Sequence, residues 1–484
     1  MAYGSNWQRK SYYLSPPWGR CVVSSLYGWL ERRHRYGDAF WSTLNQLKRL
    51  ERASNESLLA YQFERLNRFL SKAADEVQYY REVFARNGFS PERFEHRDQL
   101  SVLPILDKET VRQQMTDLIS KKLSSYSPRW VHTSGTTGKA LQFPLSSFCF
   151  QREYAFRAHH YSWANVDLVR RQPKAFVAGH PVTDPASSEP PFWTYDVANN
   201  WLLFSSYHLS QRNLPAYVAE LEKFSPVLIG GYPSSIALLA AAQKKWGSGR
   251  LNVKAVYTAS ETLLEYQRKL IESAFGCKVF VWYGNTEMCG HIAQCEQGVL
   301  HGRLEHSFME VLDESGYPAR EGALVCTGFG NSAFPLIRYN TGDVVKLSDD
   351  QVCGCGRGGI LFESVIGRVE DYVVTPDDRL VGRLDHLFKD AIHVIEAQLL
   401  QADPSELVIR IVPRPEYTVQ DESSIVSEAR LRLGPEIKLR FEYVQALERT
   451  SNGKARFVIS SINKSQLTHE RRPVGGVFAG ANQS

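Results

Sequence analysis

Residues 226–235 read PVLIGGYPSS, residues 254–261 read KAVYTASE, and residues 277–287 read CKVFVWYGNTE. Each stretch starts with a short apolar run that is typical of a buried strand and ends in a loop of glycine and small polar residues. KAFVA at 174–178 is a fourth strand of this kind. Helical segments are expected between these strands. This alternation predicts an α/β fold with mainly parallel sheets wrapped by helices.

The loops after the strands predict where a ligand binds. In parallel sheets, ligands lie beyond the carboxyl ends of the strands. The loops GGYPSS, ASE and YGNTE are therefore expected to face one site.

The length of 484 residues fits a large domain and a smaller one. A helical stripe is expected over 55–85, whereas 1–54 forms a basic, aromatic extension without a clear period. After Gly367 the pattern changes to strands at 407–412 and 438–444 with a helix at 423–433. We predict an N-terminal domain at 1–366 and a small, mobile α+β C-terminal domain at 367–484.

The formal net charge of +5 is small for this length, and part of it lies in the run RRHR at 32–35. A solvated basic helix face explains this run, and no nucleic-acid partner is expected. No stretch approaches the ~20 apolar residues that span a bilayer. We expect a cytoplasmic protein. The alternative is peripheral contact with the inner membrane, through an amphipathic helix that includes CVVSSLYGWL at 21–30.

The heptapeptide TSGTTGK at 133–139 indicates a phosphate-binding loop. Its glycines allow close approach of the backbone, and its hydroxyls and free N–H groups donate to phosphate oxygens. A P-loop has four residues between its glycines and a Ser or Thr after the lysine. Here two residues separate Gly135 from Gly138, and Ala140 follows Lys139. A kinase or GTPase is therefore disfavoured.

This loop resembles the phosphate-binding loop of the adenylate-forming superfamily, and later motifs of that superfamily follow in order. They are YGNTE at 283–287, YNTGD at 339–343, GRVED at 367–371 and NGK at 452–454. The phrases SSYHLS (205–210), GGYPSSI (230–236), PLIRYNTGD (335–343) and CGCGR (353–357) are similar to the phenylacetate–CoA ligase branch and its capsule-biosynthesis (CapK-like) relatives.

The resemblance implies a role for each motif. The implied nucleotide-binding residues are Thr133, Ser134, Gly135, Thr136, Thr137, Gly138, Lys139, Ala259, Ser260, Glu261, Tyr283, Gly284, Asn285, Asp343 and Arg368. Thr286 would contact the α-phosphate, Glu287 would hold Mg²⁺, and Lys454 would act during adenylation. The implied acyl pocket contains His208, Gly231 and Tyr232.

Two positions depart from the superfamily pattern. Glu370 stands where the interdomain hinge usually has Asp, and Leu141 stands where many members carry a second loop lysine. The second half-reaction is therefore less firmly predicted than adenylation.

A cysteine–histidine set predicts a structural zinc site. Three thiolates and one imidazole complete a tetrahedral zinc set with no open position. The expected ligands are Cys295, His301, Cys353 and Cys355, and the competing ligands are Cys289, His291 and Cys326. Free buried cysteines are the alternative.

The expected activity is ATP-dependent activation of a carboxylic acid as its acyl-adenylate, with release of pyrophosphate. The acyl group then passes to an acceptor, by default coenzyme A. The alternatives are an acyl-AMP ligase that forms an amide or ester with an amine or sugar in surface-polysaccharide synthesis, and a non-catalytic nucleotide-binding descendant.

Overall fold

The computed structural model describes most of the chain in separate ranges. These are residues 11–132, 141–179, 182–184, 187–209, 212–249, 251–260, 263, 265–367, 373–376, 380–381, 384–388, 394–413, 415–445 and 458–462.

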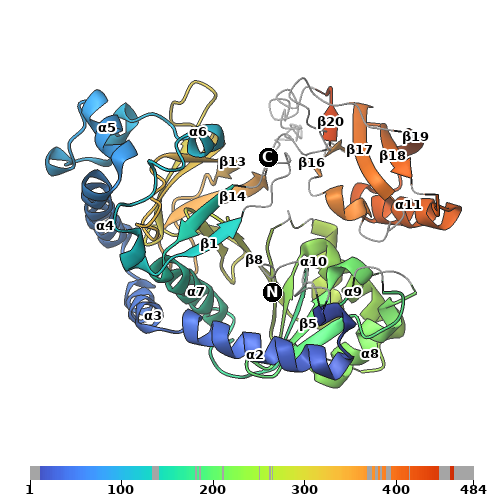
Figure 1. The fold of residues 1–484 in the computed structure, drawn as a ribbon. Helices are drawn as coiled ribbons and strands as arrows, with labels where there is room; N and C mark the ends of the chain where they lie inside the picture. Colours follow the sequence, from blue (N-terminus) through green and yellow to red (C-terminus); the bar gives the residue numbers. More distant parts are fainter. Residues whose placement is uncertain are drawn as a thin grey trace, which may run out of the picture.

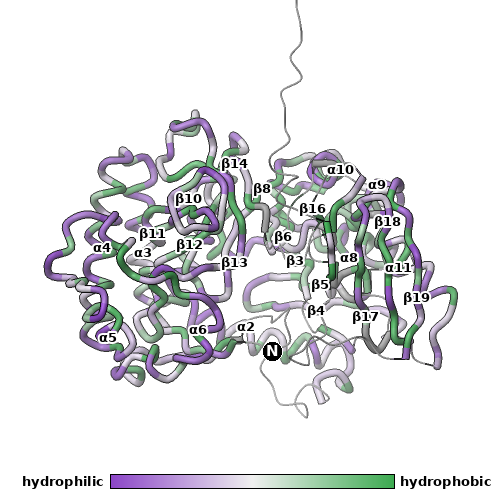
Figure 2. Tube along the Cα trace, turned by 90° about the horizontal axis from the view of Figure 1, so that it is seen from above, coloured by the Kyte–Doolittle hydropathy of each residue, from purple (hydrophilic) through white to green (hydrophobic). Residues whose placement is uncertain are grey.

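A twelve-stranded sheet runs through the described N-terminal part of the chain in the order β11-β12-β13-β14-β10-β9-β8-β7-β6-β3-β5-β4. Its parallel strands are β3 (Lys174–Ala178), β5 (Trp201–Ser205), β6 (Leu228–Gly231), β7 (Ala255–Thr258) and β8 (Lys278–Gly284). The antiparallel β4 (Trp193–Asp196) forms the edge. Strands β3, β6 and β8 are hydrophobic along much of their length (Figure 2). The predicted α/β class is confirmed, although β6 starts two residues later than expected.

The other half of the sheet is antiparallel. It contains β9 (His291–Gln294), β10 (Leu300–Gly302), β11 (Ser307–Leu312), β12 (Glu321–Gly328), β13 (Tyr339–Leu347) and β14 (Ile360–Gly367). Strand β9 pairs antiparallel with β8, and this pairing joins the two halves. A separate hairpin consists of β1 (Arg129–His132) and β2 (Gln142–Leu145).

Helices cover both faces of the parallel strands. Helices α8 (Leu214–Phe224), α9 (Pro233–Trp246) and α10 (Glu265–Phe275) share one core with the strands, and α3 (Asp38–Leu50) and α7 (Ser147–Ser162) share another. Figure 1 shows these two groups on opposite sides of the strands. Each fully buried Leu, Ile, Val or Phe contributes about 1.5–3 kcal/mol. The sheet is thus a stably packed base for the loops at its edge.

The N-terminal segment is helical. Helix α2 (Pro17–Arg35) and α3 occupy the extension for which no clear period was found. The expected helix over 55–85 is interrupted at Val77, whose φ of −123° ends α4 (Asn55–Glu76) before α5 (Gln78–Arg86) begins. A short helix, α6 (Lys108–Gln113), follows. No helix in the described ranges is long and apolar enough to cross a membrane.

The C-terminal part has its own sheet and core. The order is β19 (Lys438–Tyr443), β18 (Glu406–Pro413), β17 (Val394–Asp403), β20 (Val458–Ser460), with α11 (Val419–Leu433) packed against it. A two-stranded pair, β15 (Val373–Val374) and β16 (Leu380–Val381), precedes it. The predicted α+β character is confirmed (Figure 1), and the boundary between 366 and 367 stays a prediction.

Candidate active site and cysteine cluster

The ends of β6, β7 and β8 lie side by side in parallel register. Gly231 pairs with Thr258, and Thr258 pairs with Val281. The Ala259 N–H donates to the Gly231 carbonyl over 3.2 Å. The loops that begin at Tyr232, Ala259 and Asn285 therefore leave the same edge of the sheet.

Gly231 sits where no side chain fits. Its φ is +151°, and a Cβ there would lie 1.9 Å from the Val177 carbonyl oxygen. The close approach brings the loop after β6 against β3, and the Tyr232 N–H donates to the same carbonyl over 3.2 Å. Gly231 thus fixes the direction of this loop, in which the sequence resemblance placed part of the acyl pocket.

Tyr283 and Asp343 join two motifs that are far apart in the sequence. The Tyr283 hydroxyl donates to Asp343 Oδ2 over 2.7 Å. Burial, and then the Asp343 carboxylate, raise the pKa of Tyr283 well above its usual range, so the phenol keeps its proton. Asp343 follows Gly342, which has a φ of +78°. The side chain of Asp343 is half-buried and is oriented by this bond.

A second tyrosine makes the reciprocal contact. The Tyr339 hydroxyl donates to Glu287 Oε1 over 2.9 Å. Tyr339 is 1% exposed and Glu287 is 6% exposed. Thr286, next to Glu287, is exposed. Each motif therefore supplies a hydroxyl that holds a carboxylate of the other. Tyr339 was missed as a site residue, although it begins the quoted motif YNTGD.

The turn after β8 is held by its asparagine. Asn285 Oδ1 accepts from the Cys289 N–H over 3.1 Å, and the Asn285 carbonyl accepts from the Met288 N–H over 3.0 Å. Met288 has a φ of +52°. This tight turn places Thr286 and Glu287 at its tip.

His208 is buried and its two ring nitrogens are occupied. Nδ1 lies 2.8 Å from Ser205 Oγ, and Nε2 lies 3.0 Å from the Asp184 carbonyl oxygen. The ring stacks on Phe192 with centroids 4.8 Å apart. The carbonyl must accept from Nε2–H, so Nδ1 accepts from Ser205. These contacts hold the imidazole ring of His208 in place. That His208 lines the acyl pocket stays a prediction.

Several predicted site residues lie outside the described residues. They are Thr133, Ser134, Gly135, Thr136, Thr137, Gly138, Lys139, Glu261, Arg368, Glu370 and Lys454. Their roles stay predictions.

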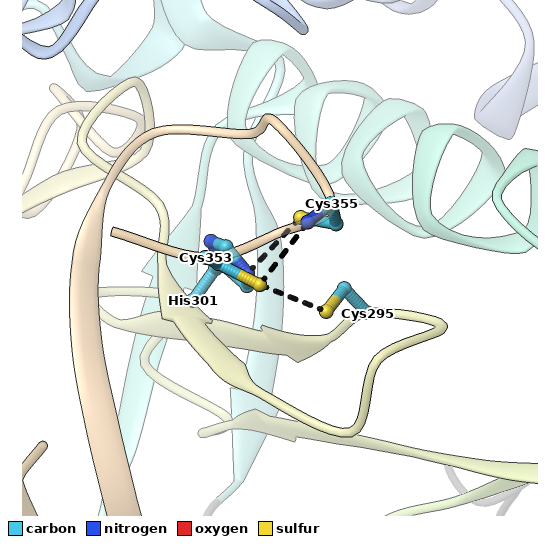
Figure 3. A group of neighbouring side chains, drawn as sticks. All are labelled: Cys295, His301, Cys353 and Cys355. Carbon is cyan, nitrogen blue, oxygen red and sulfur yellow. Dashed lines mark hydrogen bonds between the residues drawn. The ribbon is translucent and has the colours of Figure 1, made fainter. Parts of the chain in front are cut away.

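The four expected zinc ligands converge on one point (Figure 3). Their ligand atoms all lie within 4.8 Å of one another. Cys295 Sγ lies 3.7 Å from Cys353 Sγ, and Cys355 Sγ lies 3.5 Å from His301 Nε2. A tetrahedral zinc with Zn–S near 2.3 Å and Zn–N near 2.0–2.1 Å requires S···S of ~3.8 Å and S···N of ~3.5 Å. The two measured distances match these edges.

The surroundings of the cluster suit metal ligation. The Gly358 carbonyl lies 3.1 Å from His301 Nδ1, which fixes the proton there and leaves the Nε2 lone pair for the cluster. Burial lowers the pKa of His301 and raises the pKa of Cys295 to about 12. A cation is therefore needed to stabilise the Cys295 thiolate. Backbone N–H groups of Cys355 and Arg357 donate to the sulfurs of Cys353 and Cys355.

The cluster loop is tied to the end of α3. Arg357 pairs with Glu51 at 2.8 Å and with Glu296 at 2.7 Å, and its guanidinium lies 4.3 Å from the centre of the Trp163 ring. Arg52 Nη1 donates to the Cys355 carbonyl over 2.9 Å. Among the described residues, the group consists of the four expected ligands. The competing ligands Cys289, His291 and Cys326 do not belong to it.

One of those competitors, His291, belongs to a second buried group with Glu153 and His306. His306 Nε2 lies 3.1 Å from Glu153 Oε2, and His291 Nδ1 lies 3.5 Å from Glu153 Oε1. Arg157 Nε lies 3.5 Å from the same carboxylate. The Arg157 guanidinium already balances the negative charge of Glu153. Glu153, His291 and His306 together therefore do not favour binding of a divalent metal ion.

Comparisons with solved structures identify the fold. The chain superposes on 2-hydroxyisobutyryl-CoA ligase in complex with 2-HIB-AMP and CoA, with a TM-score of 0.54 and 18% identity over 87% of this chain and 93% of that one. The same ligase in its postadenylation state gives a TM-score of 0.53. The fold is that of the adenylate-forming ligases.

Sequence comparisons narrow the relationship. The chain is 25% identical to protein CapK of Staphylococcus aureus over 464 residues, which cover 93% of this chain and 99% of that protein. It is 25% identical to phenylacetate-coenzyme A ligase of Thermus thermophilus over 67% of this chain and 73% of the ligase. Residues 373–461 match the CapK C-terminal domain. The chain is thus a relative of CapK and the phenylacetate–CoA ligases, and the predicted resemblance is confirmed.

Proposed function

We propose that this chain is an AMP-forming ligase that activates a carboxylic acid as its acyl-adenylate and then transfers the acyl group to an acceptor. The observation that carries the proposal is the reciprocal pairing of Tyr283 with Asp343 and of Tyr339 with Glu287. It holds two carboxylates beside the loops at the carboxyl edge of a parallel sheet, where ligands of such folds bind.

The chemistry assigns a task to each group. The acid and the α-phosphate are both anionic, so the reaction depends on positive charge and on alignment of the reacting atoms. Mg²⁺ bound by Glu287 would neutralise phosphate charge. The loop 133–139 would hold the outer phosphates, Asp343 would accept hydrogen bonds from the ribose hydroxyls, and Lys454 would stabilise the charge that develops during adenylation.

Acid-dependent release of pyrophosphate tests this proposal. A panel of aryl, fatty and amino acids is screened with wild type, with Lys454→Ala, and with the exposed control Lys438→Ala. We expect release with at least one acid in wild type and in the control, and loss of the signal in Lys454→Ala. Nucleotide binding without acid-dependent release in wild type would favour the non-catalytic descendant.

The acceptor is the second question. Coenzyme A is our first proposal, supported by the likeness to phenylacetate–CoA ligases. An amine or hydroxyl of a surface polysaccharide is the alternative, and it rests on the resemblance of the sequence motifs to capsule-biosynthesis relatives. Mass spectrometry of reactions with coenzyme A or with amino sugars separates them, because one gives a thioester and the other an amide or ester.

We also propose that Cys295, His301, Cys353 and Cys355 bind a structural zinc ion, supported by the matching distances and the closed ligand set. A further proposal is that the N-terminal helix α2 contacts a membrane surface. Its exposed apolar and basic residues support this proposal.

A further inference from the structure

Helix α2 directs polar residues toward the protein and apolar residues toward solvent. Its buried positions are Arg20, Ser24, Gly28 and Glu31, spaced three or four residues apart. Its exposed apolar positions include Trp18, Val22, Leu26, Trp29 and Leu30. Val22 and Ser24 are two positions apart, as are Leu26 and Gly28, and two positions correspond to about 200° around a helix of 3.6 residues per turn. The apolar stripe is thus opposite the buried stripe.

The buried stripe is anchored by polar contacts. Arg20 donates to Thr183, and the Arg129 guanidinium binds the Glu31 carboxylate. Asn199 Nδ2 donates to the Gly28 carbonyl over 3.2 Å. A Cβ at Gly28 would lie about 2.1 Å from the Asp196 carboxylate, so the helix lies directly on this polar surface. These contacts fix the outward direction of the apolar stripe.

The outward stripe is large. Trp18 is 73% exposed, Leu26 is 60% exposed and Leu30 is 50% exposed. Figure 1 shows α2 along the outer edge of the molecule. Contiguous apolar surface of this kind marks a site of contact with another surface.

Cations flank the stripe. The Arg33 guanidinium lies 4.4 Å from the centre of the Trp29 ring. An open groove of about 1030 Å³ runs beside α2, and its described lining includes Trp29, Trp41, Arg32, Arg33 and Arg171 but no carboxylate. The last turn of α2 holds Arg32, Arg33, His34 and Arg35. An apolar stripe with tryptophans and a basic flank matches the headgroup region of a bilayer that contains anionic lipid.

We propose that α2 binds the surface of a membrane containing anionic lipid, with its apolar stripe in the headgroup–acyl boundary and its arginines on lipid phosphates. A protein partner would not require cations concentrated along one flank. Adenylation needs none of these residues, so this binding surface is independent of the proposed reaction.

Vesicle flotation of the full chain tests the proposal. The vesicles are phosphatidylcholine alone or equimolar phosphatidylcholine and phosphatidylglycerol. We expect wild type to float with the anionic vesicles, and high salt to reduce flotation. Leu26→Glu and Arg33→Glu should each reduce binding at least about tenfold, because one places a carboxylate in the apolar stripe and the other reverses a flanking charge.

Matched variants elsewhere on the surface distinguish binding through α2 from nonspecific adsorption to the vesicles. Val352→Glu replaces another exposed apolar residue, and Arg86→Glu reverses another exposed arginine. Both should float like wild type. Leu26→Glu, Arg33→Glu and Val352→Glu should keep the wild-type melting temperature because the substituted side chains are exposed, whereas Arg86→Glu also loses the ion pair with Glu82 and should melt slightly lower. Failure of wild type to float, or equal flotation of all variants, overturns the proposal. Loss of self-association in Leu26→Glu with unchanged flotation also overturns it, in favour of an interface between copies.

Discussion

The Tyr283 hydroxyl lies 2.7 Å from the Asp343 carboxylate, although sixty residues separate the two in the sequence. The bond links the end of β8 to β13, which are separated in the sheet by the three strands β14, β10 and β9. The Asp343 carboxylate is therefore oriented by a hydroxyl group of the motif YGNTE.

Removing this hydroxyl should weaken nucleotide binding. In Tyr283→Phe, Asp343 loses one fixed donor, which is worth about 1 kcal/mol or about a fivefold rise in the Kd for ATP. Calorimetric titration measures this change. Tyr317→Phe, at an exposed tyrosine, is the control and should bind ATP like wild type. Equal ATP affinities of wild type, Tyr283→Phe and Tyr317→Phe would show that the hydrogen bond from Tyr283 to Asp343 does not contribute to ATP binding.

The cysteine cluster should hold about one zinc per chain. Metal analysis by mass spectrometry should find zinc in wild type and none in Cys353→Ser. The variant should also lose on the order of 3 kcal/mol of unfolding free energy, since removing one ligand leaves the others buried without their ion. Cys277→Ser, outside the cluster, should retain the metal. A metal-free wild type purified without chelators would contradict the assignment.

Replacing Gly231 should be costly. In Gly231→Ala, a methyl group would meet the Val177 carbonyl at 1.9 Å and the backbone would adopt an unfavourable φ. We expect the unfolding free energy to fall by about 3 kcal/mol or more. Gly249→Ala is the control, because a Cβ at Gly249 would meet nothing within 4 Å. Urea unfolding compares the two, and similar midpoints would argue against a strained contact.

Stability should fall in mild acid through the buried group of Glu153, His291 and His306. Burial lowers the pKa of His306 from 6.5 to about 4, and the nearby Arg152 adds to the effect. Below pH 6.5 the unfolded chain therefore binds a proton that the folded chain excludes, so stability is lost as the pH falls from 6.5 to 4. The slope of unfolding free energy against pH measures this loss.

His306→Gln should flatten that slope between pH 6.5 and 4, because glutamine does not titrate. The exposed His34→Gln should leave the slope unchanged. Identical slopes for wild type and His306→Gln would assign the acid sensitivity elsewhere.

Periodicity and loop composition predicted β3, β6, β7 and β8, because a strand buried on both faces must be apolar along its length. The parallel strand β5 was not predicted. Periodicity gave only an alternative helix at 21–30 within α2, because the apolar residues of α2 face outward and its stripe facing the protein contains Arg20 and Glu31. It also missed the interruption at Val77, which depends on a local backbone turn rather than on hydrophobic spacing.

The sequence motifs of the candidate active site were predicted, but the hydrogen bonds between the motifs were not. The roles of Glu287 and Asp343 came from family resemblance, whereas the bonds from Tyr339 and Tyr283 depend on how β13 is placed relative to β8. For the cysteine cluster, spacing left Cys289, His291 and Cys326 as competitors. Only the three-dimensional structure shows that Cys295 and His301, rather than these competitors, lie next to Cys353 and Cys355.

The polar attachment of α2 also bears on how such chains diversify. A helix that contributes apolar residues to a core cannot be lost without leaving a void. Because α2 rests on Thr183, Asn199 and Arg129 through hydrogen bonds and charge, its departure would uncover surface that water can solvate. Evolution could therefore exchange, shorten or remove this helix, and with it the membrane contact proposed above, without redesigning the buried core of the large sheet.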